Sequence, residues 1–448
     1  MRVQRILARR HVVALAFGAM VGWSWVLLTG LWIGRAGSLG AVLAFVIAGV
    51  AMVLIALTYA ELAAAMPQTG GEHVYTARAF GPGLSFLCTW ALLFGYVSVV
   101  AFEVVALPYA LSALLPAIDV GRLWQVGEWP VYASHIAIGI GAALALTAVN
   151  VRGIESAARL QGVVTLLIVG AGIMLCTGAV GQGGAPNLEP LFADGVAGIL
   201  GVVVMVPLMF VGFDVIPQAA EEIDLPPARI GALVVVSVLC AVAWYGAVVL
   251  AVGWVLDAPA RAAEALPTAA AASRAWGDSR AGVLLICGGI AGIVTTWNAF
   301  LVGASRLVHV MAEDGQLPRW LAGGGAAEAG APRRALWVIC GLSCLAPWFG
   351  RPALVWLVDA GSVGVIVAYA IVALAFLRLR AREPDMPRPY RVPYGQWVGR
   401  AAFVLAVAIG LLYLPWSPSA LRWPEEWLVC LTWVVLGFAF HLARQRRA

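Results

Sequence analysis

The chain has 448 residues, of which 62% are hydrophobic and only 11% are charged, and its mean hydropathy is +0.92. Soluble domains are nearly half apolar and about a quarter charged, so this composition excludes a water-soluble globular protein. The formal net charge is +5, and every basic residue is an arginine because the sequence contains no lysine. The arginines cluster at the ends of apolar runs, which indicates an orientation signal in a membrane and not a nucleic-acid-binding surface.

Apolar runs recur along almost the whole chain, and most are long enough to cross a bilayer core of about 30 Å as a helix. The first run exceeds the apolar part of a typical signal peptide and leads into another apolar run without a small-residue cleavage pattern, so it is predicted to be retained. The predicted membrane helices, about twelve in all, cover residues 12–33, 39–66, 84–115, 131–149, 160–180, 195–219, 229–255, 280–311, 335–349, 354–379, 398–415 and 426–443.

The arginines also predict how these helices are oriented. With the N-terminus in the cytoplasm, 21 of the 28 arginines fall on the cytoplasmic side and 7 on the opposite side. Short cytoplasmic loops carry the excess of basic residues, so both termini are predicted to be cytoplasmic in a plasma membrane such as the bacterial inner membrane. Residues 1–448 are predicted to form a single membrane domain, with a short external helix within residues 257–278.

The cysteines and histidines form no recognisable site. All seven cysteines lie in or at the ends of apolar runs, and no pair has zinc-ribbon context. The five histidines are scattered along the chain. Disulfides, a structural metal and a cofactor are therefore not expected, and the absence of clustered catalytic residues at one depth argues against an intramembrane enzyme.

Two predicted helices contain helix-interrupting residues near their middle. Residues 18–25 read GAMVGWSW, and residues 210–214 read FVGFD, with Pro217 shortly after. Unwound backbone at membrane depth is tolerated only where it lines a cavity or is buried in protein. The exposed N–H groups of one half-helix suit a carboxylate and the C=O groups of the other suit an ammonium group, which together predict a site for a zwitterion. The alternative is that these glycines only allow close helix packing.

The segment after the second predicted helix carries a resemblance to a known family. It reads YAEL over residues 59–62, MPQTGGEHVY over residues 66–75 and FGP over residues 80–82. An acid, a proline and paired glycines before a tyrosine resemble the signature of the amino acid-polyamine-organocation (APC) permeases. Residues 212–226 and 305–318 resemble the sixth helix and the end of the eighth helix of that family.

The resemblance covers roughly residues 10–400 and implies an all-α, leucine-transporter-type fold. This fold has two inverted five-helix repeats, here residues 12–180 and 195–379, with helices 1 and 6 broken, and two extra helices within residues 398–443. The implied function is secondary active transport of a small amino acid or related amine by alternating access, as a symporter or antiporter. A transporter-like membrane sensor of amino acids is the alternative, although the extra cytoplasmic domain expected of a sensor is missing. The resemblance implies nothing about the oligomeric state.

Two positions depart from the family pattern. Where the family commonly has Gly-Ser-Gly, this chain has Gly22-Trp23-Ser24, so the indole of Trp23 either narrows the pocket, supplies an N–H donor or points into helix packing. Many proton-coupled members carry a lysine in helix 5, where this chain has Ile168.

The coupling ion is therefore left open between H⁺ and Na⁺. In the related sodium-coupled pattern, helix 1 carbonyls and helix 8 hydroxyls hold the ion, and the matching residues here are Val21, Thr295 and Thr296. The alternative is that the threonine hydroxyls bond back to their own helix.

Glu103 lies in an apolar run near the middle of the third predicted helix. A charge at that depth costs about 3 kcal/mol even on the mild insertion scale, so it needs a partner or a proton. The carboxyl group therefore binds a substrate amine, carries the coupling proton or forms a structural hydrogen bond in its protonated form. Asp214 either belongs to a gate or caps the half-helix that follows it.

The candidate residues fall into two groups. Phe210 is expected to be the first gate over bound substrate, with Trp25 and Phe213 beside the breaks. The residues expected to contact substrate are Gly22, Trp23, Ser24, Glu103, Phe210, Val211, Gly212 and Phe213. The gate candidates are Trp25, Glu61, Arg78, Asp214, Glu221, Glu222, Arg306 and Asp314, with ordinary interfacial ion pairs as the alternative for most of them.

Overall fold

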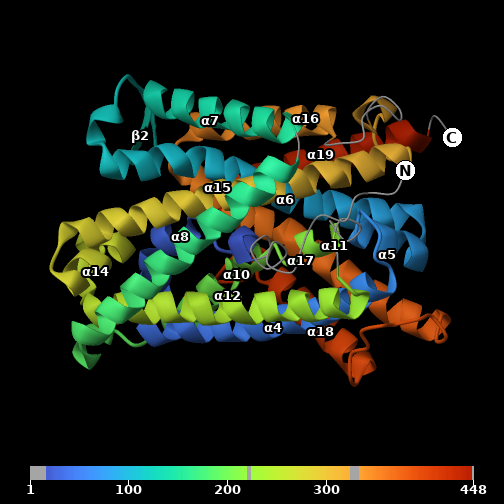
Figure 1. The fold of residues 1–448 in the computed structure, drawn as a ribbon, viewed down its shortest axis with the longest axis horizontal. Helices are drawn as coiled ribbons and strands as arrows, with labels where there is room; N and C mark the ends of the chain where they lie inside the picture. Colours follow the sequence, from blue (N-terminus) through green and yellow to red (C-terminus); the bar gives the residue numbers. More distant parts are fainter. Residues whose placement is uncertain (1–16, 153, 219–222, 224, 323–331, 446–448) are drawn as a thin grey trace.

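The computed structural model describes residues 17–152, 154–218, 223, 225–322 and 332–445. Long apolar helices run side by side through the molecule (Figure 1). The longest helices are α4 (Ser38–Ala65), α6 (Pro82–Leu114), α7 (Ala133–Arg152), α8 (Ile154–Gly181), α12 (Pro227–Val255), α15 (Ser279–Glu313), α17 (Pro352–Arg382), α18 (Gly395–Leu411) and α19 (Glu425–Gln445). Shorter helices are α2 (Ser24–Leu27), α3 (Thr29–Ala36), α5 (Glu72–Phe80), α9 (Gly195–Val203), α10 (Val206–Phe210), α11 (Val215–Gln218), α13 (Ala258–Ala263), α14 (Pro267–Trp276) and α16 (Arg333–Ser343).

The predicted all-helical membrane fold is confirmed. Within the described residues, nine helices are long and apolar enough to span a membrane, or ten if one bent pair at the start of the chain counts as a span. Two of the predicted spans are shorter than expected. The helix α16 has only 11 residues before it ends in a 3₁₀ turn, and α18 has 17, which is the lower limit for a crossing. The count of twelve and the inverted repeat stay predictions.

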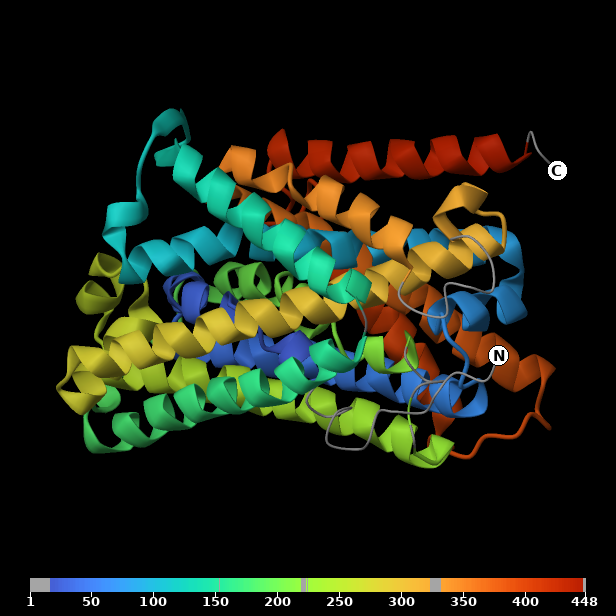
Figure 2. The same cartoon turned by 45° about the horizontal axis from the view of Figure 1, so that its top comes forward.

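The helices differ in how deeply they are buried. The most apolar stretch of α6 is 89% buried, whereas that of α19 is only 11% buried. Figure 2 shows α19, in red, along one edge of the bundle. The exposed residues of α19 include Val434, Val435 and Phe438, which are the side chains expected to face lipid. The core therefore lies around α6, which packs against α15 and α17.

A β-hairpin replaces the start of one predicted helix. Strands β1 (Arg122–Val126) and β2 (Trp129–Tyr132) pair antiparallel, and α7 begins only at Ala133. The predicted helix 131–149 therefore began too early, because Val131 and Tyr132 suit a strand as well as an apolar helix. The short helix expected within residues 257–278 is present as α13 and α14.

Both helices with predicted interruptions are broken. Residues 17–20 are helical, residues 21–23 form a bend and α2 then begins, while the axis of α3 is turned by 66° from the preceding segment. The span Gly195–Gln218 is divided into α9, α10 and α11, with an irregular stretch between Phe210 and Val215. Gly212 has φ +133°, and a Cβ atom there would lie 2.8 Å from the Cβ of Ala19. The two breaks therefore lie against each other. Glycine suits position 212 because it adopts a positive φ and because a side chain there would collide with Ala19.

Candidate functional site

The break in the first helix brings its backbone against α6 and α15. A Cβ atom on Gly22 would lie 2.7 Å from Glu103 Oε1 and 2.7 Å from Thr296 Oγ1. Such distances are shorter than any real Cβ contact, so only glycine allows this approach. Gly22 thus positions the unwound backbone beside a carboxyl group and a hydroxyl group.

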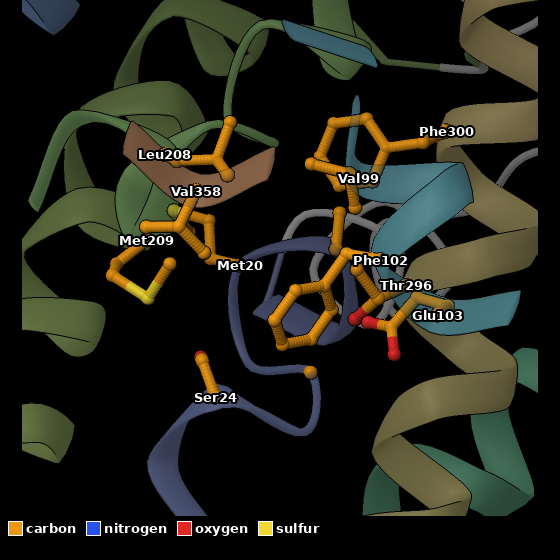
Figure 3. A pocket seen from close by; sticks show the side chains of 12 residues that line it. Met20, Ser24, Val99, Phe102, Glu103, Leu208, Met209, Thr296, Phe300 and Val358 are labelled. Atoms are coloured by element: carbon orange, nitrogen blue, oxygen red, sulfur yellow. The ribbon is translucent and has the colours of Figure 1, made fainter. Parts of the chain in front are cut away.

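A small cavity lies at this point, between the two broken helices, α6, α15 and α17 (Figure 3). Its volume is about 30 Å³, enough for one or two water molecules but far below the roughly 300 Å³ at which ligand pockets begin. This conformation is therefore closed around the site. The lining residues are Ala19, Met20, Gly22, Ser24, Val99, Phe102, Glu103, Leu208, Met209, Thr296, Phe300 and Val358.

Glu103 is the charged group of this cavity. Its side chain is 1% exposed, and the backbone N–H of Trp23 at the break donates a hydrogen bond to its carboxyl group. The second oxygen, Oε2, is buried and has no hydrogen-bond partner among the described residues. Figure 3 shows the carboxyl group beside the Thr296 hydroxyl. A buried acceptor without a donor is costly, so this oxygen is suited to receive an N–H or O–H group from a ligand.

Ser24 and Tyr245 hold the other side of the break. The Tyr245 hydroxyl of α12 donates to the Met20 carbonyl at 2.7 Å and lies 3.1 Å from the Ser24 hydroxyl. Sequence reasoning missed Tyr245, because one tyrosine in a long apolar run carries no signal for a partner more than 200 residues away. Its hydroxyl compensates backbone that the break leaves without helical hydrogen bonds.

The aromatic residues near the first break point away from the cavity. Trp23 is 1% exposed and packs on α15, where a Cβ on Gly289 would collide with its ring. Its indole N–H is buried without a partner among the described residues, so packing and the N–H donor alternative both stay open for this side chain. Trp25 packs edge-on against Trp244, with ring centroids 5.3 Å apart, and it also lies outside the cavity lining.

The two threonines of α15 contact the first helix. Thr296 donates to the Gly18 carbonyl at 2.9 Å, and Thr295 lies 3.2 Å from the same oxygen. Thr295 also bonds back to Gly292 of its own helix at 2.9 Å, as in the alternative without an ion, and its role as an ion ligand stays a prediction. A Cβ on Gly292 would lie 3.2 Å from the Val21 carbonyl. Several neutral oxygens therefore gather at one junction.

The second break contributes to the cavity through other residues than expected. Leu208 and Met209 line it, whereas Phe210, Val211, Gly212 and Phe213 do not. Phe210 packs among Phe45 and Tyr245, and Phe213 packs against Tyr59 and Tyr369. The residues of this segment that line the cavity in this conformation thus precede the predicted ones in the sequence. The sequence shows where a helix is interrupted, but it does not show which side of the preceding half-helix faces the cavity.

Asp214 folds back on the second break. Its Oδ1 accepts the Gly212 N–H at 2.7 Å and its Oδ2 accepts the Tyr369 hydroxyl at 3.2 Å. It therefore stabilises the irregular backbone that precedes it, and both the cap of the following half-helix and the gate role stay predictions.

The predicted gate residues are not brought together. Glu61 pairs with Arg380 and Arg388, and Arg78 pairs with Glu383 at 2.6 Å. Asp314 lies 2.8 Å from His73, whose pKa is lowered by burial and raised in part by this contact. Arg306 is nearly buried on α15 and has an interaction of its own. Glu221 and Glu222 lie outside the described residues. These contacts correspond to the alternative of separate ion pairs.

A bundle of apolar helices with two interrupted helices around a closed, partly polar cavity is the architecture of a membrane permease. Residues 7–440 match the family model described as amino acid permease, and the chain belongs to this family. Its homologues are amino acid permeases of the APC superfamily, as the resemblance of the loop after α4 predicts.

Three curated relatives illustrate the range of the family. The methylthioribose transporter of Bacillus subtilis (strain 168) is 24% identical over 99% of this chain and 94% of its own. The branched-chain amino acid permease BcaP of Lactococcus lactis subsp. cremoris (strain MG1363) is 25% identical over 99% and 95%. The lysine-specific permease LysP of Escherichia coli (strain K12) is 24% identical over 84% and 79%.

Proposed function

We propose that the protein is a secondary transporter that binds a small amino acid or related amine at the Glu103 cavity and exposes it alternately to each side of the membrane. The observation that carries this proposal is the buried Oε2 of Glu103, a residue that lines the cavity at the helix break, because this oxygen has no donor among the described residues. An ammonium group is the natural partner of such an oxygen.

The rest of the lining describes the remainder of the substrate. Met20, Leu208, Met209, Phe300 and Val358 make most of the wall apolar, and the polar groups gather around Glu103. A ligand with one ammonium group and a compact apolar part fits this distribution. Because the cavity is closed and small, the walls must separate to admit such a ligand, as alternating access requires. The names of the relatives support the same substrate range, from branched-chain amino acids to lysine.

Sodium coupling is a second candidate, favoured by the oxygens between helix 1 and α15. The carbonyls of Gly18 and Val21 and the hydroxyls of Thr295 and Thr296 are neutral oxygen ligands of the kind that suits a hard cation. Thr296→Val, which removes a hydroxyl but keeps the shape, is expected to abolish a sodium dependence of transport if the ion binds there.

The test is a thermal-shift screen of the purified chain followed by uptake into proteoliposomes. The probes are leucine, valine, lysine, methylthioribose and simple amines, each in NaCl and in choline chloride. A bound ligand raises the melting temperature by mass action. Glu103→Gln is expected to lose the shift, whereas Glu128→Gln, a change at an exposed residue of the hairpin turn, is expected to keep it. A shift without any uptake would favour the sensor alternative, and no shift with any probe would contradict the proposed site.

A further inference from the structure

A second buried acid lies away from the central cavity, at the contact between α5 and α11. Glu72 is the first residue of α5, and Gln218 ends α11, the short helix after the second break. Both side chains are fully buried, as is that of Asp214 in the break itself. None of the three lines the central cavity. The motif that contains Glu72 supported the family resemblance, but no role for this glutamate follows from the proposed function.

The hydrogen bonds of this group are incomplete. The Gln218 amide donates to Glu72 Oε2. The other two oxygens, Glu72 Oε1 and Gln218 Oε1, are buried without a partner among the described residues. Two buried acceptors without a donor are costly. A proton on Glu72 removes its buried charge and turns its carboxyl group into a donor.

The described residues bring no ion-pair partner to Glu72. Its titratable neighbours are Asp214 at the break, Tyr59 of α4, Tyr75 of α5, Cys88 and Tyr96 of α6 and Tyr369 of α17. The tyrosines and the cysteine are neutral at pH 7, and Asp214 adds negative charge. The ion pairs of the described residues include none to Glu72 or Asp214, and the next residue, His73, is engaged by Thr89 and Asp314. Arg306 of α15, a helix that also packs on α5, has an interaction of its own.

Two buried carboxylates that have no ion-pair partner among the described residues do not both stay ionised. Asp214 accepts from the Gly212 N–H and from the Tyr369 hydroxyl, which stabilises its charged form. Glu72 accepts from the Gln218 amide and from a backbone N–H but leaves Oε1 without a partner among the described residues, so the proton is placed on Glu72. Burial raises the pKa of Glu72 above its ordinary value, and the charge of Asp214 raises it further.

We propose that Glu72 is a proton-binding site whose occupancy is linked to the contact between α5 and α11, and thereby to transport. This inference rests on the proposed function for its last step only. Because the backbone is interrupted between α10 and α11, α11 can move away from α5 as the site opens on that side. Separation admits water, which stabilises the carboxylate and releases the proton. The chain has Ile168 of α8 where many proton-coupled members have a lysine. In this proposal its proton site lies instead between α5 and α11.

The first test concerns the proton itself and needs no substrate. Infrared difference spectra of the full chain in nanodiscs, recorded between pH 5 and 9, report the carbonyl band of a protonated carboxylic acid. Glu72→Gln is expected to remove one titrating band that Glu128→Gln retains. Size-exclusion elution and the melting temperature show whether each variant is folded. An unchanged set of bands in a folded Glu72→Gln protein would overturn the proposal.

The second test separates coupling from transport. In proteoliposomes with a transported amino acid, Glu72→Gln is expected to keep exchange between internal and external substrate, since glutamine mimics the protonated acid. It is expected to lose accumulation driven by an imposed proton gradient. If the wild-type protein accumulates substrate on a sodium gradient and not on a proton gradient, this inference fails while the proposed function stands. If the wild-type protein binds but does not exchange substrate, the proposed function fails while the proton site is still judged by its infrared band.

Discussion

Glu61 and Glu72 lie on either side of the same loop, and both side chains are almost completely buried. Glu61, in the last turns of α4, accepts from Arg380 Nε at 2.8 Å and Nη2 at 2.5 Å, and Arg388 Nε lies 3.1 Å from it. It also accepts the Val392 N–H at 2.8 Å. Glu72 accepts only from uncharged donors, the Gln218 amide and a backbone N–H, and has another acid as its charged neighbour.

The difference shows that burial alone does not decide the role of an acid. Arginines from the end of α17 and the segment after it surround Glu61 with positive charge, so its carboxylate is a fixed clamp between distant parts of the chain. The same residue type eleven positions later has no such compensation and must hold a proton. The protein therefore places a fixed charge and a titrating group side by side at the end of the bundle that carries the α4–α5 loop.

The largest loss of stability is expected when the ion pair between Glu61 and Arg380 is removed. Arg380→Met leaves Glu61 with a buried charge that Arg388 only partly compensates, which is expected to lower the free energy of unfolding by about 3–5 kcal/mol. Denaturant or thermal unfolding in detergent measures this loss. The double variant Glu61→Gln/Arg380→Met is expected to recover part of it, because the buried carboxylate is gone while Arg388 keeps its hydrogen bonds to backbone carbonyls. A double variant as unstable as the single one would show that the arginine acts through packing and not through charge.

A smaller loss of stability is expected beside Glu103. Like Glu72, this buried glutamate has one carboxyl oxygen without a hydrogen-bond partner among the described residues, but it lines the cavity. Gly22→Ala places a methyl group against Glu103 and Thr296, and this overpacking is expected to cost about 1–3 kcal/mol of stability. Ligand-induced thermal shifts are expected to disappear. Gly34→Ala is the matched control on the same broken helix, since nothing lies within 4 Å of its Cβ. Equal behaviour of the two variants would contradict the close approach at the break.

The third prediction concerns pH and separates Glu72 from Glu61 directly. Because the pKa of Glu72 is raised by burial, the folded protein holds a proton that the unfolded chain has already released above about pH 4.5. Stability is therefore expected to fall as pH rises toward the folded pKa, by at most about 1.4 kcal/mol per pH unit. Melting temperatures between pH 5 and 8 measure this slope. Glu72→Gln is expected to flatten it, and an unchanged slope would show that other groups are responsible.

These comparisons also show what the sequence was able to predict. Apolar runs of span length need only composition to be recognised, and glycines with a polar or acidic neighbour inside such runs predicted the breaks near Gly22 and Gly212. Glu103 could be singled out because an acid in an apolar run is costly wherever its helix lies, and the structure places it at the cavity. Each of these signals is local, so one segment of the sequence contains all of it.

The features that were missed depend on partners far away in the sequence or on how a helix is rotated about its axis. Nothing near Glu61 or Glu72 in the sequence distinguishes the two, because their difference comes from arginines more than 300 residues away. Tyr245 supports the first break from a helix without any polar pattern. Phe210 was predicted to cover the substrate, but Met209, which the sequence did not single out, lines the cavity, while Phe210 packs against Tyr245.

The smallest effect is expected at the ion pair between Arg78 and Glu383, which lies near the Glu61 clamp but is open to solvent. Its side chains are 50% and 32% exposed, so water and salt screen the attraction. Arg78→Ala is expected to lower stability by less than about 1 kcal/mol, and the loss is expected to vanish in high salt. Melting curves at low and high NaCl measure this, with Arg380→Met as the salt-insensitive reference. If Arg78→Ala instead abolished transport while leaving stability unchanged, the pair would belong to a gate, and exposure would not be a sufficient guide to the role of an ion pair in this protein.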